Sequence, residues 1–148
     1  MSDIGKRVKS LLLGQRHGVL AVSDSQTSIP YGALVNYACD AKGYPIFLFS
    51  SLARHTHALL KQPAASLLVN ELPTTGDVLT GMRASIMGGC VNLGQNTEVQ
   101  AAYLAAHPYA AGYVGFGDFS FWQLEPELIH TVAGFGQIAT LPASEVFG

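Results

Sequence analysis

Charged side chains are scarce in this chain. Asp, Glu, Lys and Arg make up 12% of its 148 residues, whereas roughly 25% is typical of soluble domains. A nucleic-acid-binding surface needs a dense basic stripe, and eight scattered basic residues do not form one. We therefore exclude a nucleic-acid partner. The missing charge also indicates that part of the surface is buried in an oligomer.

Cysteines and long apolar runs are equally sparse. Cys39 and Cys90 are too few and too far apart for a disulfide scaffold or a zinc site. Their apolar surroundings predict buried free thiols. No apolar run approaches the ~18 residues that would span a bilayer. We therefore expect a soluble, cytoplasmic protein with no membrane partner and no metal site.

The sequence also lacks a recognisable catalytic set. No Ser/His/Asp order, paired-carboxylate spacing or Cys/His couple stands out, so the catalytic residues stay unspecified. His17, His107 and His130 have no metal-ligand spacing and are predicted to be structural. If the protein is an enzyme, a cofactor performs the chemistry and the chain positions it.

Strand-like periodicity is what the sequence has in abundance. Short apolar or alternating segments lie between turn residues, and helical spacing is confined to three segments. The helices are expected at residues 3–15, from residue 51 to about 62, and at 97–106, the last opening with a Thr97 capping box. The strands are expected at residues 18–23, 30–39, 46–49, 65–70, 82–91, 118–124 and 128–132.

These elements predict one domain, residues 1–148, of mainly β (α+β) class. Consecutive strands joined by turns, with helices inserted singly, indicate an antiparallel barrel of six to seven strands with a few peripheral helices. Gly88-Gly89 suggests a bulge or barrel corner. Residues 72–81 read as a loop and residues 133–136 as a tight turn.

The segment from Phe47 to Leu60 is the most informative in the chain. An apolar strand runs through Ser50 and Ser51 into a helix that opens with Arg54 and His55. Hydroxyls, free backbone N–H groups and the positive end of the helix dipole converge at such turns. The segment therefore predicts an anion site. The alternative is an ordinary serine cap followed by solvated polar residues.

The ordered series of motifs resembles the FMN-binding split β-barrels related to pyridoxamine 5′-phosphate oxidase, and most nearly their haem-utilisation branch. The motifs are Gly18–Ala21, Pro30–Tyr37, Ser50–Leu59, Ala65–Val69 and Asp118-Phe119 leading to 133–136. The resemblance implies a split barrel and a homodimer with cofactor sites at the subunit interface.

The resemblance also implies which residues bind the cofactor. The flavin ring would lie along one strand and the phosphate would bind at the following strand–helix turn. Arg83 would face the cofactor or the partner subunit. The implied cofactor-binding residues are Ala33, Leu34, Val35 and Asn36 for the ring, and Ser50, Ser51, Arg54, His55 and Thr56 for the phosphate.

Three functions follow from this reading. The first is an FMN-binding flavoprotein of the pyridoxamine 5′-phosphate oxidase-like type, an oxidoreductase acting on an unidentified small substrate. The second is a haem-binding or haem-degrading split barrel, for which His55 or His57 is the nearest candidate axial ligand. The third is a dimeric binding module without catalysis.

Overall fold

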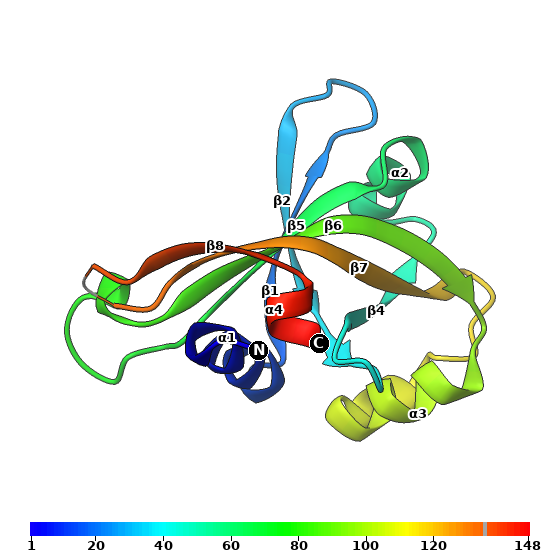
Figure 1. The fold of residues 1–148 in the computed structure, drawn as a ribbon. Helices are drawn as coiled ribbons and strands as arrows, with labels where there is room; N and C mark the ends of the chain where they lie inside the picture. The colour runs from blue at the N-terminus through cyan, green and yellow to red at the C-terminus, as the bar shows by residue number, and fades with distance from the viewer. Residues whose placement is uncertain (135) are drawn as a thin grey trace.

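One antiparallel sheet of eight strands forms the body of the protein. The computed structural model describes residues 1–134 and 136–148. The strand order is β2-β1-β5-β6-β7-β4-β3, with β8 beside β7, and the sheet curls into half a barrel (Figure 1). This confirms the predicted mainly β, split-barrel fold. The strands are β1 His17–Ser23, β2 Pro30–Asn36, β3 Ala38–Cys39, β4 Pro45–Ser50, β5 Ala64–Asn70, β6 Arg83–Gly94, β7 Phe119–Val132 and β8 Ile138–Pro142.

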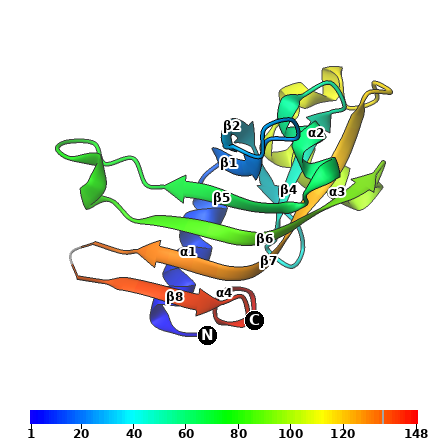
Figure 2. The same ribbon diagram turned by 90° about the horizontal axis from the view of Figure 1, so that it is seen from above.

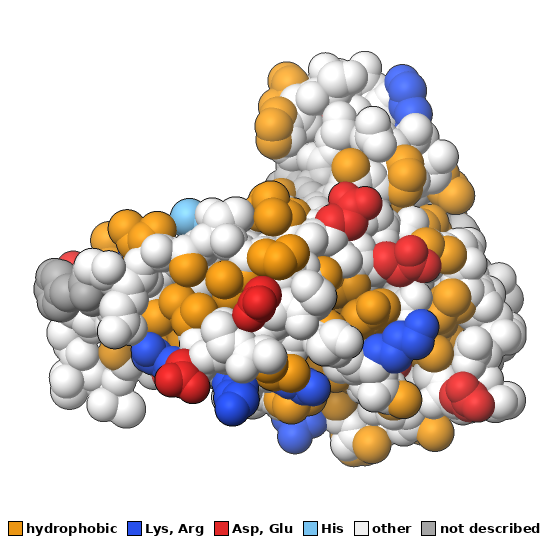
Figure 3. Space-filling model, in the orientation of Figure 1, with side chains coloured by type: hydrophobic (Ala, Val, Ile, Leu, Met, Phe, Trp, Pro, Cys, Tyr) orange, Lys and Arg blue, Asp and Glu red, His pale blue; other side chains and the backbone are white. Residues whose placement is uncertain are grey.

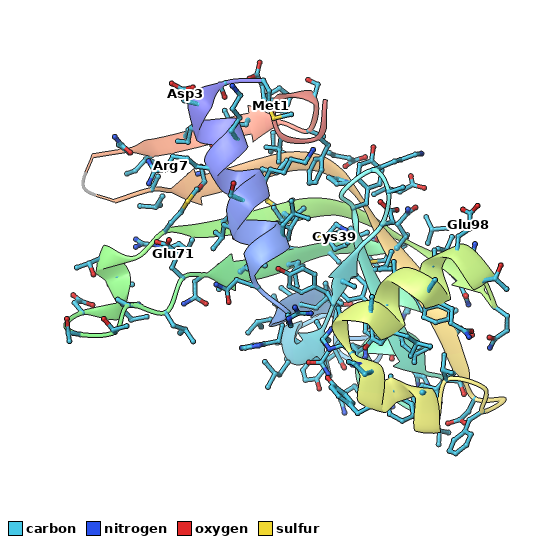
Figure 4. The ribbon with its side chains drawn as sticks, turned by 90° about the horizontal axis from the view of Figure 1, so that it is seen from below. Met1, Asp3, Arg7, Cys39, Glu71 and Glu98 are labelled. Atoms are coloured by element: carbon cyan, nitrogen blue, oxygen red, sulfur yellow. The ribbon has the colours of Figure 1, made fainter. Side chains whose placement is uncertain are left out.

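The helices lie at the inner face and the ends of the sheet. The predicted first helix is α1 (Asp3–Gly14), which begins where the Ser2 hydroxyl accepts a hydrogen bond from the Gly5 amide. It crosses the inner face (Figure 4). Its N-terminus meets the C-terminal α4 (Ser144–Phe147), where the Ser2 amide donates to Glu145 Oε2 at 3.1 Å. The remaining helices are α2 Arg54–Lys61, η1 Val78–Thr80, α3 Thr97–Ala106 and η2 Pro108–Gly112.

Strand β4 is buried on both faces, which explains its unbroken apolar run. Phe47 and Phe49 point into the main core beneath α1. Ile46 and Leu48 point into a second cluster, which α3 and Phe121 of β7 complete. The strand therefore separates two packed layers.

The predicted strand at 30–39 is two strands, and Tyr37 stands at the break. β2 pairs with β1, while β3 pairs with β4, so the chain passes from one edge of the sheet to the other. Between the two ladders, the Tyr37 amide donates to the Arg16 carbonyl at 3.0 Å. The Tyr37 carbonyl lies 2.7 Å from His107 Nε2. These contacts give hydrogen-bond partners to the Tyr37 N–H and C=O groups, which lie outside both strand ladders.

Other sequence predictions are sharpened or corrected. The Gly88-Gly89 bulge is confirmed by a register shift between Met87 and Gly88. The strands expected at 118–124 and 128–132 are the single long β7, and β8 and α4 were not predicted. The predicted Thr97 cap is wrong: Asn96 is the N-cap, and its Oδ1 accepts from the Val99 amide. Phe135, within the predicted turn 133–136, lies outside the described residues.

The sheet face opposite α1, here called the outer face, is largely apolar. Its two central cross-strand rows contain no Asp, Glu, Lys or Arg. Figure 2 looks onto this face. In Figure 3 apolar and uncharged side chains dominate the inside of the angle between the β1–β2 hairpin and the arm formed by β6 to β8. The exposed large apolar residues of the outer face include Val19, Leu34, Leu68, Leu128 and Ile138.

Candidate functional site

A pocket lies at the seam where β2 and β4 contact each other without pairing. Its volume is about 330 Å³, within the range of small-molecule sites. Apolar and aromatic side chains form most of its wall, and α2, the α3–η2 segment and β7 close it. We call it the seam pocket. Its lining residues are Leu34, Val35, Asn36, Leu48, Phe49, Ser50, Ala53, His55, Tyr103, Tyr113 and Phe119.

His55 is the candidate ligand-binding residue in this wall. Its ring packs edge-on against Phe49, with centroids 4.3 Å apart. Its Nε2 atom is buried and has no hydrogen-bond partner among residues 1–134 and 136–148. Burial lowers the pKa of His55 below its usual range, because the charged form loses hydration. A neutral imidazole with an unpaired nitrogen is the form of histidine that binds metals.

The serine hydroxyls of the predicted anion turn are engaged within the protein or face solvent. The Ser50 hydroxyl donates to Asp118 Oδ2 at 3.1 Å and accepts from the Leu52 amide. The Thr56 hydroxyl donates to the Ser50 carbonyl at 2.7 Å. Ser51 is exposed, and its carbonyl accepts from His57 Nε2 at 2.7 Å. A carboxylate therefore sits at the turn where a phosphate was expected.

Arg54 points away from the seam pocket. Its Nε donates to Asp24 Oδ1 at 2.6 Å, and its guanidinium lies 6.0 Å from the Tyr31 ring centre. Asp24 also accepts from Thr27, and these contacts hold the pKa of its carboxyl far below the usual range. The ion pair ties the β1–β2 hairpin to α2. The first turn of α2 has no side-chain cap. Arg54 is tolerated in that turn because its charge is paired with Asp24.

The structure brings half of the predicted site residues together. Leu34, Val35, Asn36, Ser50 and His55 line the seam pocket. Ala33, Ser51, Arg54 and Thr56 flank it. Arg83, the first residue of β6, donates to the Leu79 and Gly81 carbonyls. The start of β6 lies far along the sheet from α2 (Figure 2). Cofactor binding by these residues stays a prediction.

The aromatic wall of the pocket was not predicted. Tyr103 lies in α3 and Tyr113 directly follows η2, about 50 to 60 residues beyond the strand–helix turn. Tyr109 bonds to Asn36 Nδ2 at 3.1 Å. A helix was predicted at 97–106, but nothing local indicated that Tyr103 would face this pocket.

Other predicted features behave as follows. Cys90 is buried as predicted, whereas Cys39 is half-buried. Burial raises the pKa values of both thiols to about 12, as expected for inert thiols. Among residues 1–134 and 136–148, no three His, Cys, Asp or Glu residues gather as a metal site would require. In the same residues no helix is long and apolar enough to cross a membrane.

The fold and the seam pocket define a split-barrel protein. Residues 10–147 match the family model described as CREG, beta-barrel, so the chain belongs to the CREG beta-barrel family. The resemblance predicted from the sequence is therefore confirmed at the level of the split barrel. Membership of the FMN-binding oxidases themselves is not shown.

Two of the similar proteins are named for haem. The chain is 39% identical over 132 residues to "Non-canonical heme oxygenase HOZ, chloroplastic" of Arabidopsis thaliana; the match covers 87% of this chain and 40% of that protein. A solved structure 34% identical covers all of this chain and 98% of its own, with a TM-score of 0.90. The heme binding protein from Mycobacterium smegmatis, 22% identical, also gives a TM-score of 0.90 and shows the same fold over 99% of this chain and 60% of its own.

These matches bear unevenly on the predicted functions. The curated relative is named as a heme oxygenase, and the structure that is 22% identical shows the fold alone. The chain spans 40% of the length of the heme oxygenase relative, which leaves that relative's activity a proposal for this protein. Placement in the cytoplasm stays a prediction, since that relative is named as chloroplastic.

Proposed function

We propose that this protein binds haem in the seam pocket, with His55 as the axial ligand. The observation that carries the proposal is a neutral imidazole with an unpaired, buried Nε2 in the wall of an aromatic pocket. Haem supplies redox chemistry at its iron when bound. The apolar and aromatic lining suits the faces of a porphyrin.

His55 is a better candidate than His57. His57 is exposed, and its Nε2 donates to the Ser51 carbonyl. His107 is buried but has both ring nitrogens engaged, with Tyr109 and Tyr37. Because the His55 Nε2 is enclosed, ligation through that atom requires a rotation of its ring away from Phe49.

FMN is the competing cofactor, and the pocket favours it less. An FMN phosphate is dianionic and needs cations or free donors. The Arg54 charge is paired with Asp24, His55 is desolvated, and the Ser50 hydroxyl donates to Asp118. Haem has a larger apolar body and its carboxylates lie at one edge only. FMN is therefore titrated in parallel, and flavin binding without haem binding would reverse the proposal.

Replacing His55 with alanine is expected to weaken haem binding at least about tenfold and to shift the Soret band. The reason is the loss of the proposed iron ligand. Haem is titrated into both proteins and followed by absorbance. His57→Ala is the matched control, since it removes an exposed histidine two residues away, and its Soret band should match that of the unaltered protein. Equal titrations for His55→Ala and the unaltered protein would remove His55 as the ligand.

Haem degradation and simple binding are separated by one further measurement. With ascorbate as reductant and O₂ present, a degrading enzyme bleaches the Soret band and a binding module retains it. Retention would favour the non-catalytic alternative. An unaltered protein that gives no Soret shift at all would contradict haem binding in either form.

We propose further that a second copy of this chain covers the outer face. The apolar side chains of this face are contiguous across the sheet, from Leu34 through Val19 to Leu68. Leu34 is 75% exposed and also lines the seam pocket, so a partner there would border the haem site. Apolar patches of this kind mark protein–protein contacts.

Leu68→Lys is expected to convert a dimer into a monomer, because it places a charge near the centre of the outer face. Sedimentation velocity at micromolar concentrations measures the change. The control is Leu13→Lys, another exposed leucine, carried by α1 on the opposite side of the sheet, which should leave the mass unchanged. A monomeric unaltered protein would refute the dimer.

A further inference from the structure

The seam pocket has a polar end at Asn36, remote from the Ser50 turn. Asn36 is exposed and ends β2, and Tyr109 and His107 lie beside it. His107 is 2% exposed, and its presence is explained by the strand break, where its Nε2 meets the otherwise unpaired Tyr37 carbonyl. The same ring also fixes how Asn36 presents its amide.

The direction of the hydrogen bonds follows from the carbonyl. A carbonyl oxygen only accepts, so His107 Nε2 holds a hydrogen and donates at 2.7 Å. In the neutral ring Nδ1 then accepts from the Tyr109 hydroxyl at 2.8 Å. The Tyr109 oxygen in turn accepts from Asn36 Nδ2 at 3.1 Å. These hydrogen bonds therefore orient the Asn36 amide with its N–H₂ group toward Tyr109. One of the two Nδ2–H groups remains available to donate to a ligand.

The charged group nearest the pocket lies at its Ser50 end. There Asp118 accepts the Ser50 hydroxyl, and its carboxylate disfavours an anionic ligand group. Asn36 lies opposite His17 in the β1–β2 ladder. No Asp or Glu is among the described residues that line the pocket, so an anionic ligand group meets no like charge at the Asn36 end.

We propose that the Asn36 end of the seam pocket binds a carboxylate of the ligand whose apolar body occupies the pocket. Asn36 donates its remaining Nδ2–H to the carboxylate. Tyr109 and His107 are positioning residues that hold the amide in its donating orientation. The inference rests on the proposed haem function, under which the carboxylate is a propionate. It places the anion at the opposite end of the pocket from the turn predicted by the sequence.

The test compares haem with haem dimethyl ester, in which both carboxylates are masked. Binding is followed by the Soret band and by quenching of the single tryptophan, Trp122. Asn36→Asp, which puts a carboxylate against the ligand's carboxylate, is expected to weaken haem binding at least about tenfold. It should change the affinity for the ester less than about twofold, since no charge is repelled.

Tyr109→Phe tests the positioning role. It removes the hydroxyl that orients the Asn36 amide and is expected to weaken haem binding about threefold while sparing the ester. Tyr44→Phe is the matched control, because Tyr44 packs against Phe147 and does not line the seam pocket. The ratio of haem to ester affinity should not move in the control. Thermal unfolding of each variant excludes a folding defect as the cause.

The outcomes separate this inference from haem binding itself. If the unaltered protein binds haem and the ester equally well, and Asn36→Asp weakens neither or both alike, the carboxylate site is wrong and haem binding stands. If the unaltered protein binds neither porphyrin, both proposals are overturned. The site is supported if the unaltered protein binds haem more tightly than the ester and Asn36→Asp abolishes that difference.

Discussion

Gly88→Ala is expected to lower the free energy of unfolding by about 3 kcal/mol, the upper end for overpacking. A Cβ at Gly88 would lie 1.9 Å from the Glu125 carbonyl oxygen and 2.9 Å from its carbon. Both atoms belong to the backbone of β7, so no side chain can rotate away. The alanine fits only if the bulge between β6 and β7 moves. Urea unfolding followed by Trp122 fluorescence measures the change.

The adjacent glycine provides a matched control. A Cβ at Gly89 meets no atom within 4 Å, so Gly89→Ala should change stability by less than about 1 kcal/mol. Both variants replace a glycine with alanine at adjacent positions of the same bulge. The change in intrinsic backbone preference is therefore the same in both. Equal stabilities for the two would show that the close approach at Gly88 does not shape the barrel corner.

His107→Ala is expected to lower the free energy of unfolding by about 3 kcal/mol as well. It leaves the Tyr37 carbonyl without a donor at the strand break and opens a cavity among Tyr103, Tyr109 and the backbone of Tyr37. An unpaired buried carbonyl alone costs roughly 1–3 kcal/mol. Thermal or urea unfolding gives the measurement.

Two further variants test which part of the lost free energy of unfolding comes from the hydrogen bond. His107→Gln keeps a side-chain donor and should recover part of the stability. His130→Ala removes an exposed histidine of β7 whose ring bonds to Thr140 of β8. It should alter stability by less than about 0.5 kcal/mol. If His107→Ala were as stable as His130→Ala, the strand break would not depend on the imidazole.

The fold was predictable wherever the information was local. Helical spacing with a serine cap defined α1, and the glycine pair marked the bulge in β6. The break at Tyr37 was hidden because both halves of the 30–39 segment favour strand. Only the position of β4, which pairs with the second half, separates them. The joining of two expected strands into β7 likewise depends on partners from three other strands.

The sequence indicated which residues lie near one another, but not how their charges are paired. Asn36, Ser50 and His55, three of the predicted residues, line one pocket, and their binding of a cofactor stays a prediction. The sequence could not show that Arg54 pairs with Asp24, a residue 30 positions earlier. It also could not show that the Ser50 hydroxyl donates its hydrogen bond to Asp118. Both partners reach the turn through the closure of the sheet. A motif read locally therefore suggested a cationic site where the folded chain has paired charges.

Strand β7 has a consequence for the order in which the molecule can be completed. It is the single link in the sheet between β6 on one side and β4 on the other. A nascent chain that has not yet released residues 119–132 from the ribosome holds two separate sheets, β2-β1-β5-β6 and β4-β3. Contacts across such long separations form slowly. Closure of the barrel must therefore await the release of residues 119–132.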